Sequence, residues 1–249
     1  ALALCAVCGL RSVPAVRAED SATAASMRLM KTEGTVSLND GNGKKLSVFE
    51  RMLLRSGYQM ETKEKSYAWI NLDDTKLIKM DAVSEAAIQK DGKKLEVRLN
   101  AGALFFNVTE PLAENESLNI RISTAIIGIR GTSGWVRILD SRTAEVSVLE
   151  GTVYCHVTDP ISGQVKEGAV TGGETVRCEV YLPETPGDKC AIVRQKFDVK
   201  DIPGFVLVDA SPDDPLCEKV LTETGLDIRG WNGNPRQKLR EELAEVHRK

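Results

Sequence analysis

Residues 87–100 read Ala-Ile-Gln-Lys-Asp-Gly-Lys-Lys-Leu-Glu-Val-Arg-Leu-Asn. In the second half of this stretch, Leu95, Val97 and Leu99 alternate with charged and polar residues. A period of two residues gives one apolar and one polar face, and it predicts a strand with one buried side. The Asp91-Gly92 dipeptide suits the left-handed dihedral angles of a two-residue turn. The stretch therefore predicts a β-hairpin.

The same pattern of short apolar strands and turn residues extends to either side, from about residue 27 to residue 180. Ala68, Ile70 and Leu72 alternate before a turn at residues 73–75, and strands are expected in the same way on both sides of Glu150-Gly151. The strand and turn units follow one another at roughly 8 to 15 residues, which is typical of all-β folds. We therefore expect an all-β sandwich, barrel or stacked roll over residues 28–181.

The pattern changes after residue 181, where loops rich in proline and glycine begin. Residues 182–249 are expected to form a small, irregular C-terminal appendage with two short helices. The first is predicted near residues 215–224, which Gly225 ends, and the second near residues 235–248. The second helix reaches Lys249 without a cap, so we expect either a frayed terminal helix or a chain that continues.

The first ten residues are apolar without interruption. Such a run has the length of a secretory signal and falls far below the roughly 20 residues of a membrane-spanning helix. Val16 and Ala18 supply small residues before a cleavage site. Residues 1–18 are therefore expected to be a truncated signal peptide, with a buried apolar segment as the alternative, and no membrane span is expected in the mature chain.

Six cysteines are present, and removal of residues 1–18 would delete Cys5 and Cys8. An even number of remaining cysteines in an exported chain, without paired C-x-x-C motifs, favours disulfides over zinc. If the compartment is reducing, they are expected to be buried small hydrophobes instead. The sequence leaves three pairings open for the remaining four: Cys155, Cys178, Cys190 and Cys217.

The composition restricts the classes of function. Lys and Arg number 33 against 36 Asp and Glu, so there is no excess positive charge to neutralise nucleic-acid phosphates. Only two histidines, His156 and His247, are available for catalytic or metal constellations. We therefore expect a non-catalytic protein without nucleic-acid partner, metal or cofactor.

The segment from Ser123 to Val136 places one cation, Arg130, among apolar residues and glycines. Together with other motifs in order along the chain, it resembles the FecR domain family over about residues 28–180. The resemblance is carried by these segments: Gly34-Thr-Val36, Leu54-Arg-Ser-Gly57, Tyr67-Ala-Trp-Ile-Asn-Leu-Asp-Asp74, Leu99 to Val108, Ile129-Arg-Gly-Thr132 and Val148-Leu-Glu-Gly-Thr-Val153. Val97 departs from the family pattern, which has Leu at that position.

The resemblance implies an exported, rolled or solenoid-like β-module with no catalytic activity of its own. The best-known members of the family sense siderophore uptake through a periplasmic FecR domain and a cytoplasmic helical segment. This sequence has neither an internal apolar span nor such a segment, so iron-responsive signalling is not carried over. It is similar to the stand-alone FecR-domain proteins that bacteria export.

Two sets of residues are candidates for function. Arg130 is expected either to be a buried strut bonded to carbonyls or a carboxylate, or to contact a partner. The strut interpretation makes the whole motif of Ile129, Arg130, Gly131 and Thr132 structural. Tyr67, Trp69 and Trp135 are expected to form either a surface on which a ligand stacks or part of the core.

We therefore expect a periplasmic, cell-surface or secreted protein that acts as a binding, sensing or scaffold module at the bacterial cell envelope. Its partner is expected to be a protein or an envelope polymer that meets the faces or edges of its sheets. The alternative is a carbohydrate-binding module, or the accessory part of a larger surface enzyme. Exposed and coplanar Trp69 and Trp135 would favour that alternative.

Overall fold

The computed structural model describes residues 26–207, 215–228, 237, 238 and 241. The predicted signal peptide with Cys5 and Cys8, most of the predicted helix near 235–248, and His247 lie outside the described residues.

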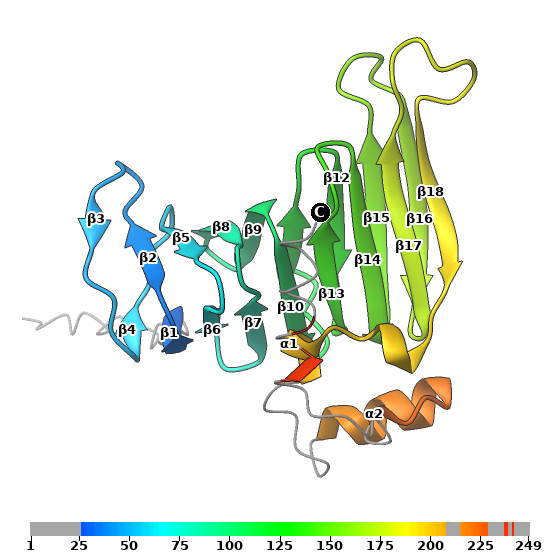
Figure 1. Ribbon diagram of the computed structural model, residues 1–249. Coiled ribbons are helices and arrows are strands. Elements are labelled where there is room, and N and C mark those ends of the chain that lie inside the picture. The colour runs from blue at the N-terminus through cyan, green and yellow to red at the C-terminus, as the bar shows by residue number, and fades with distance from the viewer. Residues whose placement is uncertain (1–25, 208–214, 229–236, 239–240, 242–249) are drawn as a thin grey trace, which may run out of the picture.

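Two sheets of nine strands each form the β-domain, as Figure 1 shows. In the first, sheet A, the spatial order is β18 (Cys190–Lys196), β17 (Glu174–Val180), β14 (Thr143–Glu150), β13 (Ser133–Ile138), β10 (Ala103–Val108), β7 (Lys76–Met80), β6 (Tyr67–Asn71), β1 (Arg28–Glu33) and β4 (Met52–Leu53). In the second, sheet B, it is β16 (Val165–Thr171), β15 (Thr152–Thr158), β12 (Ala125–Ile129), β11 (Ser117–Arg121), β9 (Lys94–Ala101), β8 (Glu85–Asp91), β5 (Gln59–Thr62), β2 (Val36–Asn39) and β3 (Lys45–Leu46).

Neighbouring strands pair antiparallel except β9 and β11, which run parallel. The chain winds back and forth between the sheets, so the all-β, rolled architecture expected from the sequence is confirmed. A residue with positive φ lies at every crossing between the described strands except the one from β10 to β11. Most are glycines, and Arg51, Lys65 and Val83 are the others.

Two of these corners show why glycine is required. A Cβ atom on Gly34 would lie 2.4 Å from the Ser66 hydroxyl, which accepts a hydrogen bond from a backbone N–H at the corner. A Cβ atom on Gly102 would lie 2.2 Å from the Ser84 hydroxyl, which accepts from Ala103 N–H in the same way. Only glycine tolerates both the positive φ and this close approach.

The hairpin at Asp91-Gly92 is confirmed, because β8 and β9 pair with Asp91 opposite Lys94. The turn at residues 73–75 likewise joins the paired strands β6 and β7. The strands expected on both sides of Glu150-Gly151 are present as β14 and β15. β14 lies in sheet A and β15 in sheet B, so Gly151 makes a crossing between sheets rather than a hairpin.

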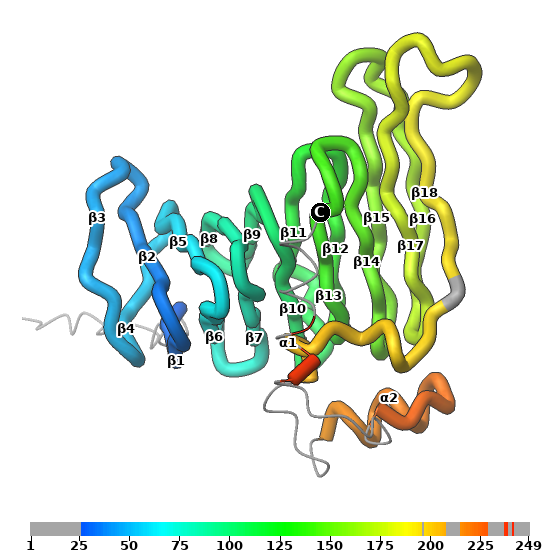
Figure 2. Tube along the Cα trace, in the orientation of Figure 1, coloured from blue at the N-terminus to red at the C-terminus, as the bar shows by residue number. Residues whose placement is uncertain are grey.

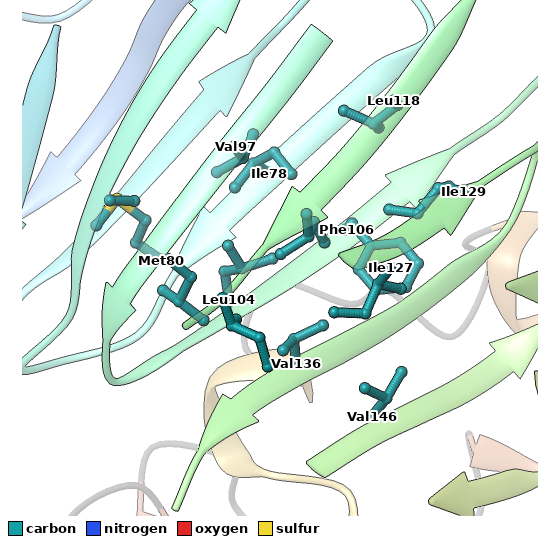
Figure 3. Close-up of a cluster of buried hydrophobic side chains, with 14 of the residues drawn as sticks. Ile78, Met80, Val97, Leu104, Phe106, Leu118, Ile127, Ile129, Val136 and Val146 are labelled. Atoms are coloured by element: carbon teal, nitrogen blue, oxygen red, sulfur yellow. The ribbon is translucent and has the colours of Figure 1, made fainter. Parts of the chain in front are cut away.

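The main core lies between the two sheets. Inward residues of both sheets interdigitate there, and Figure 3 shows Leu104, Phe106 and Val136 from sheet A near Ile127 from sheet B. Phe106 is fully buried, and it lies against the position where Gly134 has no side chain. Truncating a buried side chain of this size to Ala costs about 3–5 kcal/mol.

The roll tapers from one end to the other, as Figures 1 and 2 show. β3 and β4 have two residues each, whereas β16, β17 and β18 have seven. The edge strands of the wide end are β16 in sheet B and β18 in sheet A.

After β18 the chain folds back against the β-domain as the C-terminal cover. It contains the 3-10 helix η1 (Val199–Asp201), α1 (Gly204–Leu207) and α2 (Pro215–Thr224). Figure 1 shows α2 beneath the strands, where both carboxylate oxygens of Glu223 accept from Gly151 N–H at 2.8 and 3.0 Å. Within the described residues, no helix is both long and apolar enough to cross a membrane.

Candidate functional site: the open face of sheet B

The C-terminal cover packs on part of the outer face of sheet A. Phe197, Ile202 and Phe205 of the cover pack in one cluster with aromatic residues of the sheet. The ammonium group of Lys79 is buried in this layer, 5.9 Å from the Trp69 ring centroid, and it donates a hydrogen bond to the Val206 carbonyl. The cover thus packs on the aromatic residues of this outer face.

The ligand surface expected from Tyr67, Trp69 and Trp135 is therefore not open. Their exposed fractions are 7%, 9% and 1%, and all three belong to the cluster under the cover. The interpretation as core holds for these residues, because the cover supplies an apolar partner that the sequence pattern of the strands does not reveal. The Trp135 indole N–H has no hydrogen-bond partner in the described structure.

The outer face of sheet B, in contrast, carries polar side chains that no described segment covers. Strand register aligns one row across the middle of this face, in which Glu96 of β9 lies opposite Asn119 of β11. Asn119 lies opposite Gly128 of β12, and Gly128 lies opposite Tyr154 of β15. Tyr154 is 48% exposed although it lies in the middle of a strand.

Two adjoining hollows lie along this row, and we call them together the sheet B groove. The first has a volume of about 450 Å³ and the second about 350 Å³, and both are lined by Ser117 and Asn119. The first is also lined by Glu116, Leu118, Gly128, Ile129, Arg130, Tyr154 and His156. The second is also lined by Ser56, Gln89, Lys90, Asp91, Lys94, Leu95, Glu96 and Arg98.

Gly128 lines the first hollow and adds no side chain to it. Ile127 and Ile129 point into the core, so a side chain at position 128 would stand in the groove between Asn119 and Tyr154. A Cβ atom there would make ordinary contacts of 3.6 and 3.7 Å, and φ of Gly128 is not positive. Neither backbone conformation nor packing therefore requires glycine at this central strand position, where it weakens a strand.

Glu96 and His156 are held by neighbours on the same face. Burial acts to raise the pKa of Glu96, but hydrogen bonds from Arg98 and Arg121 outweigh it and lower the pKa overall. A ring nitrogen of His156 lies 2.9 Å from the Glu167 carboxylate. These contacts keep Glu96 ionised at neutral pH and fix the rim of the groove.

One comparison with known proteins identifies the domain. Residues 58–154 match the family model described as FecR protein. The chain contains a FecR domain. The matched range runs from just before β5 to Tyr154 in β15, so it includes the strands beneath the sheet B groove. The match supports a regulatory or sensing role.

The other comparisons are distant. No curated protein matches the chain. Two crystal structures of a putative anti-sigma factor from Parabacteroides distasonis ATCC 8503 align to 59% of this chain with 17% sequence identity and a TM-score of 0.46. The chain covers 64% and 63% of the length of those two chains, just under two thirds.

The four residues of the FecR motif have different environments in the structure. Ile129 is buried, Gly131 has φ of +90° against Pro111, and Thr132 donates from its hydroxyl to the Thr152 carbonyl. Arg130 is exposed, so the expectation of a buried strut was wrong for this side chain. Because Ile127 and Ile129 point inward, Arg130 falls on the outer face, where it lines the groove.

All four described cysteines are buried free thiols, and the disulfide interpretation stays a prediction. A hydrogen bond with Cys155, together with burial, raises the pKa of the Cys178 thiol far above its ordinary value. Cys155 belongs to sheet B and Cys178 to sheet A, so the two thiols meet across the core. The Cys190 thiol donates instead to backbone carbonyls, and Cys217 lies in α2.

Ser133 and Glu150 lie together on sheet A, away from the described histidine. Ser133 donates to Asn107, 2.7 Å away, and to Glu150, but the described histidine, His156, is on the opposite sheet. Burial, reinforced by Glu223, raises the pKa of Glu150 against the lowering effect of a nearby lysine. Within the described part of the chain, no cluster of three or more His, Cys, Asp or Glu could hold a metal ion.

Sequence reasoning missed Asn119, Tyr154 and Ser117 as members of one site. Each is a polar or amphipathic residue on the wet side of an alternating strand, which is common in any half-buried sheet. The useful signal was Gly128, a glycine between two isoleucines within a strand. Its partners could not be named without the register of β11, β12 and β15.

Proposed function

We propose that this chain is an exported, non-catalytic FecR-domain protein that senses or holds a partner at the bacterial cell envelope through the outer face of sheet B. The observation that carries the proposal is the difference between the two faces. The chain's own cover packs on the outer face of sheet A, whereas the outer face of sheet B presents a groove lined by polar side chains.

Several features support a binding rather than a catalytic role. Arg130, the cation of the family motif, faces outward into the groove. The pKa values of the groove carboxylate Glu96 and of the remote Glu150 shift in opposite directions, but these residues lie on different sheets and do not form an acid and base pair. The partner is a protein or an envelope polymer, and the mature chain has a net charge of about −5, which disfavours nucleic acid.

The alternative of a carbohydrate-binding module built on Tyr67, Trp69 and Trp135 is not favoured. Those side chains lie under the C-terminal cover, where a sugar cannot stack on them.

Export is tested in the source organism by analysing its cytoplasmic, envelope and culture fractions for this protein by intact-mass spectrometry. We expect a mature protein that begins at Glu19. A chain that stays uncleaved in the cytoplasm would contradict the proposal.

Use of the sheet B face is tested by placing a photo-crosslinking residue at Arg130 and, as a control on the other face, at Glu179 of β17. We expect one defined envelope partner to be linked at position 130 and not at position 179. The link should disappear in Gly128→Val, in which the groove is filled. A link at position 179 alone, or one that survives Gly128→Val, would contradict the proposal.

A further inference from the structure

We propose that the sheet B groove binds an extended glycan chain of β-linked pyranose rings. This inference rests on the proposed binding function of the face and names its ligand.

Several polar groups face the sheet B groove without a hydrogen-bond partner in the described structure. They belong to Ser117, Asn119, Arg130 and Tyr154, which line the first hollow together. These side chains offer hydroxyl, amide and guanidinium groups, which both donate and accept. A ligand rich in hydroxyl groups satisfies such a mixed set, whereas an apolar ligand leaves it unsatisfied.

In the first hollow an aromatic ring lies beside a glycine that forms part of the floor. Tyr154 is half-exposed beside Gly128, where the missing side chain lets a flat ligand approach the backbone. One face of a pyranose ring carries C–H groups, which pack on an aromatic ring while the hydroxyl groups point sideways to polar partners. A ring that fills the space above Gly128 would therefore lie against Tyr154 and within reach of Asn119.

The shape of the groove also favours an extended glycan. Its lining comes from five neighbouring strands in the order β15, β12, β11, β9 and β8. At a spacing of about 4.8 Å between strands, the groove is roughly 19 Å long, which is enough for about four pyranose rings in a row. The floor is a sheet rather than a deep pocket, so an extended, ribbon-like β-linked chain fits it better than a helical α-linked chain.

The charge of the groove lining also favours a glycan over a strongly charged polymer. Acidic and basic side chains almost balance along the lining: Asp91, Glu96 and Glu116 against Lys90, Lys94, Arg98 and Arg130. A strongly charged polyanion would meet Glu96, which its arginine neighbours keep ionised by lowering its pKa. A chain with little net charge meets no such repulsion.

An extended peptide is a weaker match for this place in the fold. Peptides that bind to sheets add a strand through unpaired backbone groups at an edge. Each of the five strands under the groove has a neighbour on both sides, so its backbone groups are engaged within the sheet. Recognition in the groove must come from side chains, as it does for sugars.

The test measures binding of two tetrasaccharides to the full chain by calorimetry and by amide chemical shifts. The probes are the β-1,4-linked tetramer of N-acetylglucosamine and the α-1,4-linked tetramer of glucose. We expect the β-linked tetramer to bind, with shifts at Asn119, Gly128 and Tyr154, and to bind at least about tenfold more tightly than the α-linked one.

Three variants test the assignment to the groove. Gly128→Val should weaken binding at least about tenfold while the fold is retained, because the new Cβ atom has room. Tyr154→Ala should weaken binding similarly, whereas Tyr154→Phe should keep most of it, because stacking needs the ring. Ala169→Val enlarges a side chain beyond Tyr154 on the same face, outside the groove lining, and should leave binding unchanged.

Each result supports or overturns one of the two proposals. Absence of binding by the β-linked tetramer, equal binding of both tetramers, or full binding by Gly128→Val overturns the glycan proposal. If the glycan fails while the Arg130 cross-link to an envelope protein still forms, the occupant of the groove is a protein and the proposed function stands. If both fail, the proposed function fails as well.

Discussion

Two glycines in neighbouring parts of the FecR motif region should respond to alanine with opposite signs. Gly128 in β12 and Gly134 in β13 both lie within strands and neither has a positive φ. A Cβ atom on Gly128 would contact Asn119 and Tyr154 at 3.6 and 3.7 Å, an ordinary distance. A Cβ atom on Gly134 would lie 2.2 Å from the Ser147 carbonyl oxygen, which is backbone and cannot rotate away.

The magnitudes follow from these distances. Glycine in a strand interior costs about 0.5–1 kcal/mol relative to alanine, so Gly128→Ala should stabilise by that amount. At Gly134, β13 and β14 must move apart, and overpacking of a core costs about 1–3 kcal/mol. At roughly 2–4 °C per kcal/mol for a domain of this size, Gly128→Ala should raise Tm by about 1–4 °C, and Gly134→Ala should lower it by about 2–12 °C.

Thermal unfolding of the purified chain, followed by circular dichroism, measures both values, with denaturant titration as a check on the free energy of unfolding. Shifts of the same sign in the two variants would refute the reasoning. If both variants are destabilised, Gly128 is a structural requirement of the fold, and its use as the floor of a binding groove loses its physical basis.

Three further predictions concern the cover, an acidic residue and the thiols. Phe205→Ala removes a fully buried anchor of the C-terminal cover and should increase quenching of tryptophan fluorescence by iodide; unchanged quenching would contradict the described packing. Glu150→Gln should stabilise the fold at pH 7 but not below about pH 4. The pKa of Glu150 is raised in the fold, so ionisation of its carboxyl group removes stability as the pH rises through that pKa. A stability gain that is the same at every pH in denaturant titrations would contradict this prediction. Refolding with oxidised glutathione should join Cys155 to Cys178 and stabilise by about 3 kcal/mol; peptide mapping that finds either residue linked elsewhere would contradict the pairing.

Local features of the fold could be predicted because they depend on residues close in the sequence. Alternation in Leu95, Val97 and Leu99 and the Asp91-Gly92 turn define one hairpin without further information. The crossing at Gly151 could not be predicted, because a turn to the partner strand and a corner to the opposite sheet use the same residue types. Which occurs depends on the core that both sheets share.

Only part of the candidate site could be predicted from the sequence. The outward position of Arg130 was available from strand alternation, since Ile127 and Ile129 must face the core. The burial of Trp69 and Trp135 could not be predicted, because the residues that cover them follow β18, far along the chain. Polar residues on separate strands become one groove only through register, which no local pattern encodes.

The taper of the roll makes its two ends unequal as templates for assembly. A seven-residue edge such as β16 or β18 offers enough unpaired backbone groups for another strand to add, whereas the two-residue edges β3 and β4 offer almost none. Copies that meet wide end to wide end would therefore close as a pair, with only narrow ends left outside. A filament needs two competent ends, so the short edge strands β3 and β4 disfavour edge-to-edge growth beyond a pair.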